Sequence, residues 1–379
     1  MFEISGKYGT AKIYAEPQYI EETASTQIKA LCDSEYTEGS SIAIMPDCHA
    51  GKGCVIGFTQ TLPSKMVIPS LVGCDIGCGM YAIHLQGIDF TDEKNLQRLD
   101  MACHRDVKSG FDIWDKPHSF ASDIEDDLKE MVAPIDFDKA MRSIGSLGSG
   151  NHFIELNKSD DGTYWLVIHT GSRHLGLEVE GFYTKQAETA EGSQFAAVKG
   201  QAFEDYIHDM RIAQKFASTN RQAIARQISD AFKFNASQIV DGENGLVETI
   251  HNYIDLENMI VRKGAIRLSH NELAIIPMNM ADGSLIVRGK GNVDWNCSGP
   301  HGAGRLMSRG EARRTLKMED FKASMNGIYS TTVCKDTIDE SKMAYKPMES
   351  IVSAIKDTCD IVEVVKPIYN FKAAEKRRH

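Results

Sequence analysis

Short blocks of apolar residues dominate the first 90 residues of the chain. The segments at 41–47 (SIAIMPD), 52–59 (KGCVIGFT) and 79–85 (GMYAIHL) carry the branched and apolar residues of buried strands. Glycine-rich turns separate them. This pattern predicts that the first 90 residues form short strands broken by glycine turns.

Helical patterns occupy three later stretches. Residues 93–133 are polar with helical character, and about 180–235 shows apolar residues at helical spacing. A third helix is predicted at 307–316 (MSRGEARRTL). Strand character returns between them, at 146–156 (SLGSGNHFIEL), at 163–170 (TYWLVIHT) and across 260–290.

Nothing in the pattern divides the chain into separate domains. It contains no repeats, low-complexity linkers or Pro/Ser-rich hinges. Glycine-rich segments bearing His and Cys occur in its first, middle and last thirds. We therefore predict one α+β domain over residues 1–379, with mixed sheets around a central site and the tract at about 180–235 as a helical excursion.

Composition places the chain among ordinary globular proteins, with 42% hydrophobic and 25% charged residues. The N-terminus lacks the pattern of a secretory signal, and no apolar run is long enough for a membrane helix. Nine scattered cysteines favour a reducing compartment, so we expect a cytoplasmic protein without a membrane partner. The net charge of −11 excludes a protein that coats nucleic acid by bulk electrostatics, but allows a local basic site.

A first candidate for metal binding lies in Val72–Met80 (VGCDIGCGM). Asp75 and Cys78 stand three residues apart in a loop that its glycines allow to turn tightly. A carboxylate and a thiolate at this spacing can share a divalent cation, although a buried structural cysteine beside a turn aspartate explains the same pattern. We interpret Cys74 as a packing residue.

Three histidines offer further ligands. His152 follows a glycine turn, and His169 ends an apolar strand beside another glycine turn. A single histidine at a strand end more often bonds a backbone group than a metal ion, so two of them favour a metal site without establishing it. His251 (ETIHNY) fits a packed helical histidine equally well.

The five residues together form a ligand set of mixed hardness. One thiolate can bridge two ions while the aspartate and the imidazoles fill other positions, and the set suits manganese, zinc or iron. Two cations about 3.5–4 Å apart are suited to phosphoryl or nucleotidyl transfer.

Two more glycine-rich segments carry polar residues of interest. In MPDCHAGKG, Asp47 and His49 are expected to project from a turn, a weak signal by itself. In PHGAGRLMSR, His301 precedes a Gly-Ala-Gly turn and a helix with Arg305 and Arg309, a context suited to an anion. A histidine there can attack a phosphate and hold it as a phosphoramidate, although a capping histidine in a glycine loop fits as well. The Walker pattern is absent from the sequence.

These segments together resemble the RtcB RNA ligase family. The similarity runs in order through PDCHAGKGCVIG, VGCDIGCGM, SLGSGNHFIE, HTGSRHLG, HNY and PHGAGRLMSR, from about residue 41 to about residue 373. By position, the resemblance implies two manganese ions bridged by Cys78, with Asp75, His152, His169 and His251 as the other ligands. It implies that His301 becomes covalently guanylylated.

The resemblance also implies residues that border the guanylate. They come from several segments: Asn151, Phe153, Glu155, Asn279, Asp282, Ser284, Gly302, Ala303, Gly304, Tyr345 and Lys372. In the family pattern a glycine ends the chain directly after the near-terminal lysine, whereas here Ala373 and six more residues follow Lys372.

The activity that the resemblance implies is GTP-dependent RNA joining, in RNA repair or tRNA splicing. His301 takes GMP from GTP and passes it to an RNA 3′-phosphate, which a 2′,3′-cyclic phosphate yields on opening. A 5′-hydroxyl end then displaces GMP. Arg173, Arg305 and Arg309 are the candidates for binding RNA phosphates, and structural pairing with carboxylates is the alternative.

Two other functions remain open from the sequence. A dinuclear metal-dependent phosphoesterase, or cyclic-phosphate hydrolase, would use the five ligands without His301. A non-catalytic GTP- or RNA-binding protein would need neither a functional set of metal ligands nor a reactive His301. The filled ligand positions and the intact His301 segment favour the ligase.

Overall fold

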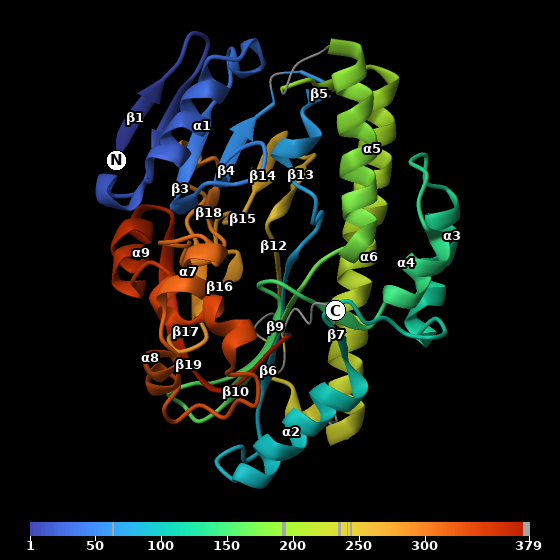
Figure 1. Cartoon of the computed structure of the whole chain (residues 1–379), viewed down its shortest axis with the longest axis vertical. Coiled ribbons are helices and arrows are strands. Elements are labelled where there is room, and N and C mark those ends of the chain that lie inside the picture. The colour runs from blue at the N-terminus through green and yellow to red at the C-terminus, as the bar shows by residue number, and fades with distance from the viewer. Residues whose placement is uncertain (63, 192–194, 234–235, 241, 243–244, 374–379) are drawn as a thin grey trace.

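The computed structural model describes residues 1–373 except 63, 192–194, 234–235, 241 and 243–244, and within these residues two large β-sheets form the centre (Figure 1). The first has the order β1-β2-β3-β4-β14-β13, and β2 and β3 are its parallel pair. Its strands are β1 (Phe2–Ser5), β2 (Thr10–Ile13), β3 (Ile42–His49), β4 (Ile56–Thr61), β14 (Ile260–Lys263) and β13 (Asn252–Asp255).

The second sheet has the order β12-β6-β10-β9-β19-β17-β16 and is antiparallel throughout. Its strands are β12 (Leu246–Ile250), β6 (Gly79–Leu85), β10 (Tyr164–Thr170), β9 (Phe153–Lys158), β19 (Cys359–Lys372), β17 (Gly283–Gly289) and β16 (Leu273–Asn279). Short pairs join β5 (Met66–Val67) to β11 (Val198–Lys199), β7 (Lys108–Ser109) to β8 (Ser146–Gly148), and β15 (Ala265–Arg267) to β18 (Ser298–Pro300).

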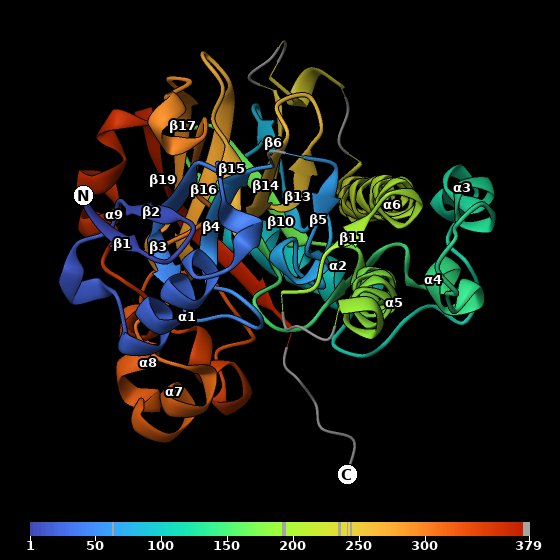
Figure 2. The same cartoon turned by 90° about the horizontal axis from the view of Figure 1, so that it is seen from above.

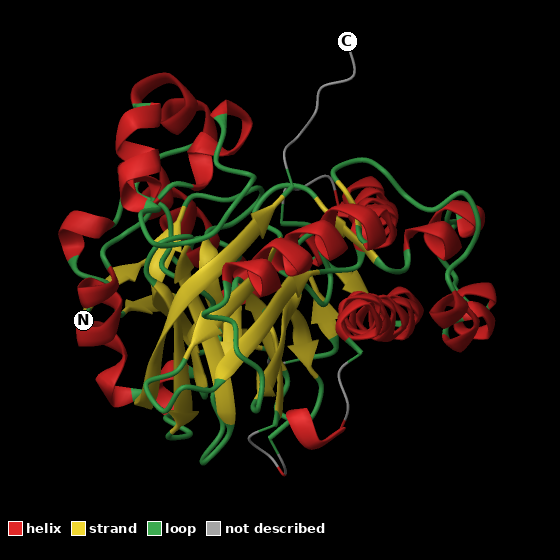
Figure 3. Ribbon diagram, turned by 90° about the horizontal axis from the view of Figure 1, so that it is seen from below, coloured by secondary structure: helices red, strands yellow, loops and turns green. Residues whose placement is uncertain are grey.

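Helices surround the strands (Figure 3). They are α1 (Glu22–Cys32), α2 (Glu93–Asp106), α3 (Glu125–Lys129), α4 (Phe137–Ser143), α5 (Arg173–Glu191), α6 (Gln201–Phe232), α7 (Arg309–Thr315), α8 (Met318–Ser324) and α9 (Met348–Ala354). The long helices α5 and α6 lie side by side on one flank with α3 and α4 outside them, and α7, α8 and α9 lie on the opposite flank (Figures 1 and 2).

The apolar spacing of α6 explains its place against the sheets. Phe203, Tyr206, Ile207 and Met210 are all buried, and they recur at the three- and four-residue steps of one helix face. This face joins a core cluster that also contains residues of α1, α5, β3 and β4.

The predicted mixture of helices and strands is confirmed, with several boundaries corrected. The segment Glu22–Cys32 is a helix, so the prediction of strands alone before residue 90 was wrong. Within its described residues, the tract at 180–235 contains two helices, α5 and α6, with β11 between them, and α5 begins at Arg173. Within 93–133 the structure has α2 and α3, and the segment between them contains the short β7 and a 3-10 helix at Ser119–Asp123.

The expectation of no membrane helix also has a structural counterpart. None of the described helices combines the length and the apolar character that crossing a bilayer requires.

Candidate active site

Four neighbouring strands bring the predicted metal ligands to one edge of the seven-stranded sheet. Because these strands are antiparallel neighbours, ends and starts alternate along this edge. It carries the end of β12, the start of β6, the end of β10 and the start of β9. Cys78 precedes β6, and His152 precedes β9. His169 lies near the end of β10, and His251 directly follows β12. Sheet topology thus converts four distant sequence positions into one cluster.

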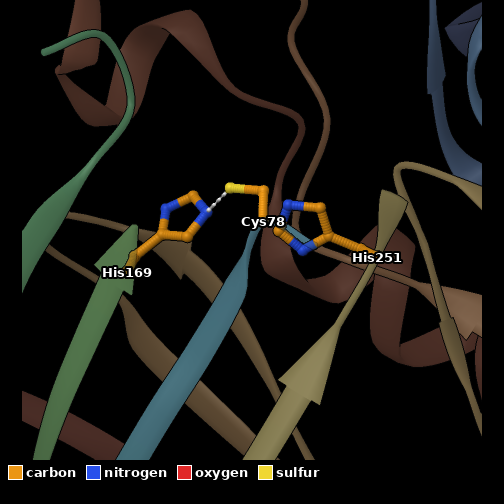
Figure 4. Close-up of side chains that lie close together, drawn as sticks. All are labelled: Cys78, His169 and His251. Atoms are coloured by element: carbon orange, nitrogen blue, oxygen red, sulfur yellow. Dashed lines mark hydrogen bonds between the residues drawn. The ribbon is translucent and has the colours of Figure 1, made fainter. Parts of the chain in front are cut away.

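The ligand atoms form two groups that share Cys78. Its Sγ lies 3.3 Å from Nε2 of His169 and 3.5 Å from Nε2 of His152. Oδ2 of Asp75 lies 3.0 Å from the same Nε2 of His152. Cys78, His169 and His251 form one group (Figure 4), and Asp75, Cys78 and His152 the other, each with ligand atoms within 4.8 Å of one another. A bridging thiolate needs this arrangement.

Backbone carbonyls fix which nitrogen of two histidines faces Cys78. Nδ1 of His152 lies 2.9 Å from the carbonyl oxygen of Leu147, and Nδ1 of His169 lies 3.2 Å from that of Asn151. When Nδ1–H donates to a carbonyl, Nε2 of the neutral ring carries no proton, and its free lone pair can bind a metal ion. Burial lowers the pKa of His169 well below its ordinary value, which favours the neutral ring.

The chemistry of this donor set fits a divalent metal ion. Burial acts to raise the pKa of Asp75, but His152 and Arg173 hold it at about 2, so the carboxylate is ionised. Burial and the Asp75 carboxylate raise the pKa of the Cys78 thiol, an effect that a coordinated cation reverses. Nδ1 of His251 is buried and has no hydrogen-bond partner among the described residues, so a coordinated ion would satisfy a nitrogen otherwise left unpaired.

Helix α6 holds two of the ligand-bearing strand ends from behind. The fully buried Arg221 donates to the carbonyl oxygens of Gly77 and Thr170, each at 2.8 Å. These residues are the immediate neighbours of Cys78 and His169. No local motif points to this role, because Arg221 occupies an ordinary buried position in a helical repeat.

The six-stranded sheet supplies the partner of His301. Asp47 is fully buried in β3, which continues to His49, so the predicted turn at this point was wrong. Oδ2 of Asp47 lies 2.6 Å from Nδ1 of His301 and accepts its backbone N–H at 3.1 Å. The carboxylate keeps a proton on Nδ1 and leaves Nε2 as the nucleophilic lone pair. The ring of His301 lies 4.8 Å from that of His251, which joins the two parts of the site.

Gly304 allows the two segments to approach this closely. Its φ is +73°, and a Cβ at this position would lie 2.1 Å from the carbonyl oxygen of Asp47. Any larger residue would therefore push the loop after His301 away from β3.

A cavity of about 610 Å³ opens beside His301. This volume is within the range of small-molecule sites. Of the residues predicted to border a guanylate, nine line it: Asn151, Phe153, Glu155, Asn279, Gly302, Ala303, Gly304, Tyr345 and Lys372. Asp282 and Ser284 do not. Asp282 accepts from Nδ2 of Asn279 at 2.9 Å, and Ser284 is fully buried in β17.

Two buried acids order the wall of this cavity. Glu340 accepts hydrogen bonds from Lys372, from Nη1 of Arg309 at 2.6 Å and from the hydroxyl of Tyr345 at 2.7 Å. Burial opposes the charge, yet Lys372, Arg309 and Arg305 hold the pKa of Glu340 at about 2. Burial raises the pKa of Glu155 to about 7, even though two asparagine amides donate to it.

The three predicted phosphate-binding arginines differ in their pairing. Arg305 and Arg309 line the cavity, but both form ion pairs with Glu340, as the structural alternative requires. Arg173 forms no ion pair with a carboxylate within the described ranges, and its Nη1 lies 3.2 Å from Nδ1 of His152. Cys74 is exposed, so its assignment to packing was wrong.

Comparisons with known proteins show which family the sequence matches. The sequence matches the family described as "tRNA-splicing ligase RtcB" over residues 35–135 and 122–373. It is 30% identical over 369 residues to the "RNA-splicing ligase RtcB" of Escherichia coli, covering 86% of this chain and 88% of that protein. Identity is 29% over 397 residues to the protein of the same name from Mycobacterium tuberculosis, covering 82% and 91%. It is 26% over 397 residues to the "tRNA-splicing ligase RtcB" of Aeropyrum pernix, covering 81% and 82%.

Proposed function

Because the chain belongs to the RtcB family, we propose that it is an RNA ligase that uses GTP and manganese to join a 3′-phosphate end to a 5′-hydroxyl end. A 2′,3′-cyclic phosphate is the alternative starting end. The observation that carries the proposal is the Asp47–His301 pair, because His301 both lines the cavity and lies beside the predicted ligand His251. The proposed setting is RNA repair or tRNA splicing.

In the first step, Nε2 of His301 attacks the α-phosphorus of GTP. The Nε2–phosphorus bond forms, the bond to the β-phosphate oxygen breaks, and pyrophosphate leaves. The ring acquires positive charge as its lone pair is used, and the Asp47 carboxylate at Nδ1 stabilises that charge. The Nδ1 proton stays between the two residues throughout.

The cavity residues hold the guanylate during this step. Phe153 offers a ring face, while Glu155 and Lys372 offer polar groups for a purine edge. The backbone of Gly302–Gly304 lines the cavity directly after His301, where small residues permit a phosphate to approach. Guanine recognition by these groups is part of the proposal.

The five ligands Asp75, Cys78, His152, His169 and His251 would hold the metal ions. When bound, such ions neutralise charge on phosphate oxygens and on an attacking hydroxyl. Arg173 is the preferred candidate of the three arginines for binding an RNA phosphate, because Arg305 and Arg309 form ion pairs with Glu340 and Arg173 forms none with a carboxylate among the described residues.

In the second step the guanylate passes from His301 to the RNA 3′-phosphate. A phosphate oxygen attacks the phosphorus, the Nε2–phosphorus bond breaks, and a pyrophosphate-linked RNA end results. In the third step the 5′-hydroxyl attacks the RNA phosphorus, GMP leaves, and a phosphodiester remains. The hydroxyl proton is released to solvent.

An RNA joining assay tests the proposal. Two labelled strands, one ending in a 3′-phosphate and one beginning with a 5′-hydroxyl, are incubated with protein, GTP and manganese. We expect a joined product with GTP that is lost with ATP or with 3′-hydroxyl and 5′-phosphate ends. Release of phosphate, or opening of a cyclic phosphate, without any joined product would instead support the hydrolase alternative.

A further inference from the structure

A buried lysine beneath β3 has no part in the steps described above. Lys346 is only 1% exposed. Its Nζ donates to the carbonyl oxygen of Pro46 at 3.0 Å and to that of Cys48 at 2.7 Å. These two residues flank Asp47, so a single ammonium group holds the backbone on both sides of the catalytic carboxylate.

The backbone of Lys346 is tied to the other half of the pair. Its N–H donates to the carbonyl oxygen of Gly304 at 2.9 Å, three residues after His301. One residue therefore connects the strand that carries Asp47 to the loop that follows His301.

The strand needs such support at this point. The register between β3 and β4 shifts between Ile44 and His49, so the regular ladder is interrupted around Asp47. Carbonyl groups in an interrupted ladder need other donors when they are buried. The ammonium of Lys346 supplies two donors there, and it places a cation near the buried carboxylate.

We propose that Lys346 is a positioning residue for guanylylation, which fixes the Asp47 carboxylate against Nδ1 of His301. The inference rests on the proposed ligase function. It concerns the steps in which His301 forms or breaks a bond to phosphorus. The final sealing step, in which a 5′-hydroxyl displaces GMP from an activated RNA end, does not use His301 and is outside its influence.

The chain offers a matched control in Lys263, a second buried lysine that binds only backbone carbonyls. It is 4% exposed, and its Nζ donates to Lys52, Cys54 and Ser70 at 2.5, 3.3 and 2.9 Å. None of these carbonyls flanks Asp47. Burial lowers the pKa of both lysines, so the two cations share a similar environment. Loss of either lysine removes a buried cation from backbone carbonyls, but only Lys346→Met removes it from the carbonyls that flank Asp47.

Two assays on Lys346→Met separate positioning from folding. The first follows transfer of label from GTP labelled at the α-phosphate to the protein, over a range of GTP concentrations. The second follows sealing of RNA whose 3′-phosphate already carries guanylate. We expect the labelling rate to fall about ten- to a hundredfold, as for a displaced catalytic group, with half-saturating GTP unchanged within about twofold. Sealing should also stay within about twofold of wild type, which shows that the variant is folded.

The remaining outcomes decide between the alternatives. Lys263→Met should alter labelling and sealing together, in proportion to any loss of stability. If Lys346→Met labels at the wild-type rate, or loses labelling and sealing in parallel as Lys263→Met does, Lys346 is not a positioning residue. Failure of the wild-type protein to label would instead reject the proposed function itself.

Discussion

Replacing Asp47 with asparagine tests the role of the carboxylate beside His301. The side chain keeps its size, but it loses the charge that faces Nδ1 at 2.6 Å. An asparagine amide that donates to Nδ1 would force the proton onto Nε2, the atom that must attack phosphorus. One that accepts from Nδ1 would stabilise the ring less as positive charge develops.

The expected size of the effect follows from this contact. A hydrogen bond to a charged group contributes about 1.5–3 kcal/mol, and each 1.36 kcal/mol is tenfold in rate. Asp47→Asn should therefore slow guanylylation by at least about 10- to 150-fold. Binding of GTP should change little, because the residue does not line the cavity.

Single-turnover labelling with GTP labelled at the α-phosphate measures the rate and the half-saturating concentration separately. Thermal melting of the same samples shows whether Asp47→Asn remains folded. A folded variant that labels within about twofold of the wild-type rate would refute the assignment of Asp47 as the partner of His301.

Three further predictions concern the ligands, the cavity and the loop. Cys78→Ser should reduce bound manganese from about two ions per chain to less than one, measured by elemental analysis after dialysis, since both ligand groups share this thiolate. Because burial raises the pKa of Glu155 to about 7 in the folded state from an ordinary 4.5, the unfolded state loses this proton first. The stability that this group contributes is thus lost as pH rises between these values. In urea unfolding, the free energy of unfolding of Glu155→Gln should therefore rise relative to wild type by up to about 3 kcal/mol between pH 4 and 8. A difference that does not depend on pH would contradict the burial argument. Gly304→Ala should lower the free energy of unfolding by at least about 2 kcal/mol, because it adds a contact at 2.1 Å to a positive φ; wild-type stability in urea would contradict it.

The sequence allowed prediction of the ligand cluster because its signals are local. Glycine-rich turns marked the segments of Cys78, His152, His169 and His301, whereas His251 has no distinctive local context and only the family resemblance favoured it as a ligand over a packed histidine. The fold class could be predicted for the same reason, since strand and helix patterns extend over short windows. Boundaries were less accurate, as α1 and the start of α5 show.

Pairings of individual side chains outside the ligand set could not be predicted. Asp47 and His301 are 254 positions apart, and no feature of either segment indicates that the two side chains form a hydrogen bond. The same holds for Arg309, which was predicted to bind a phosphate but forms an ion pair with Glu340. Nothing in the sequence around Glu340 indicates this pairing. The sequence does not distinguish Lys346 from the other lysines, because its contact with β3 exists only in the folded chain. Burial and pairing are properties of the tertiary structure, so single positions do not carry them.

Transfer of label from α-labelled GTP to the protein tests the central claim most directly. Wild type and His301→Ala are incubated with labelled GTP and manganese, then denatured and treated with acid or alkali. The account predicts label on wild type alone, stable in alkali and lost in acid, as expected of a phosphoramidate. Label on His301→Ala equal to wild type, or no label on wild type with any divalent metal, would contradict it.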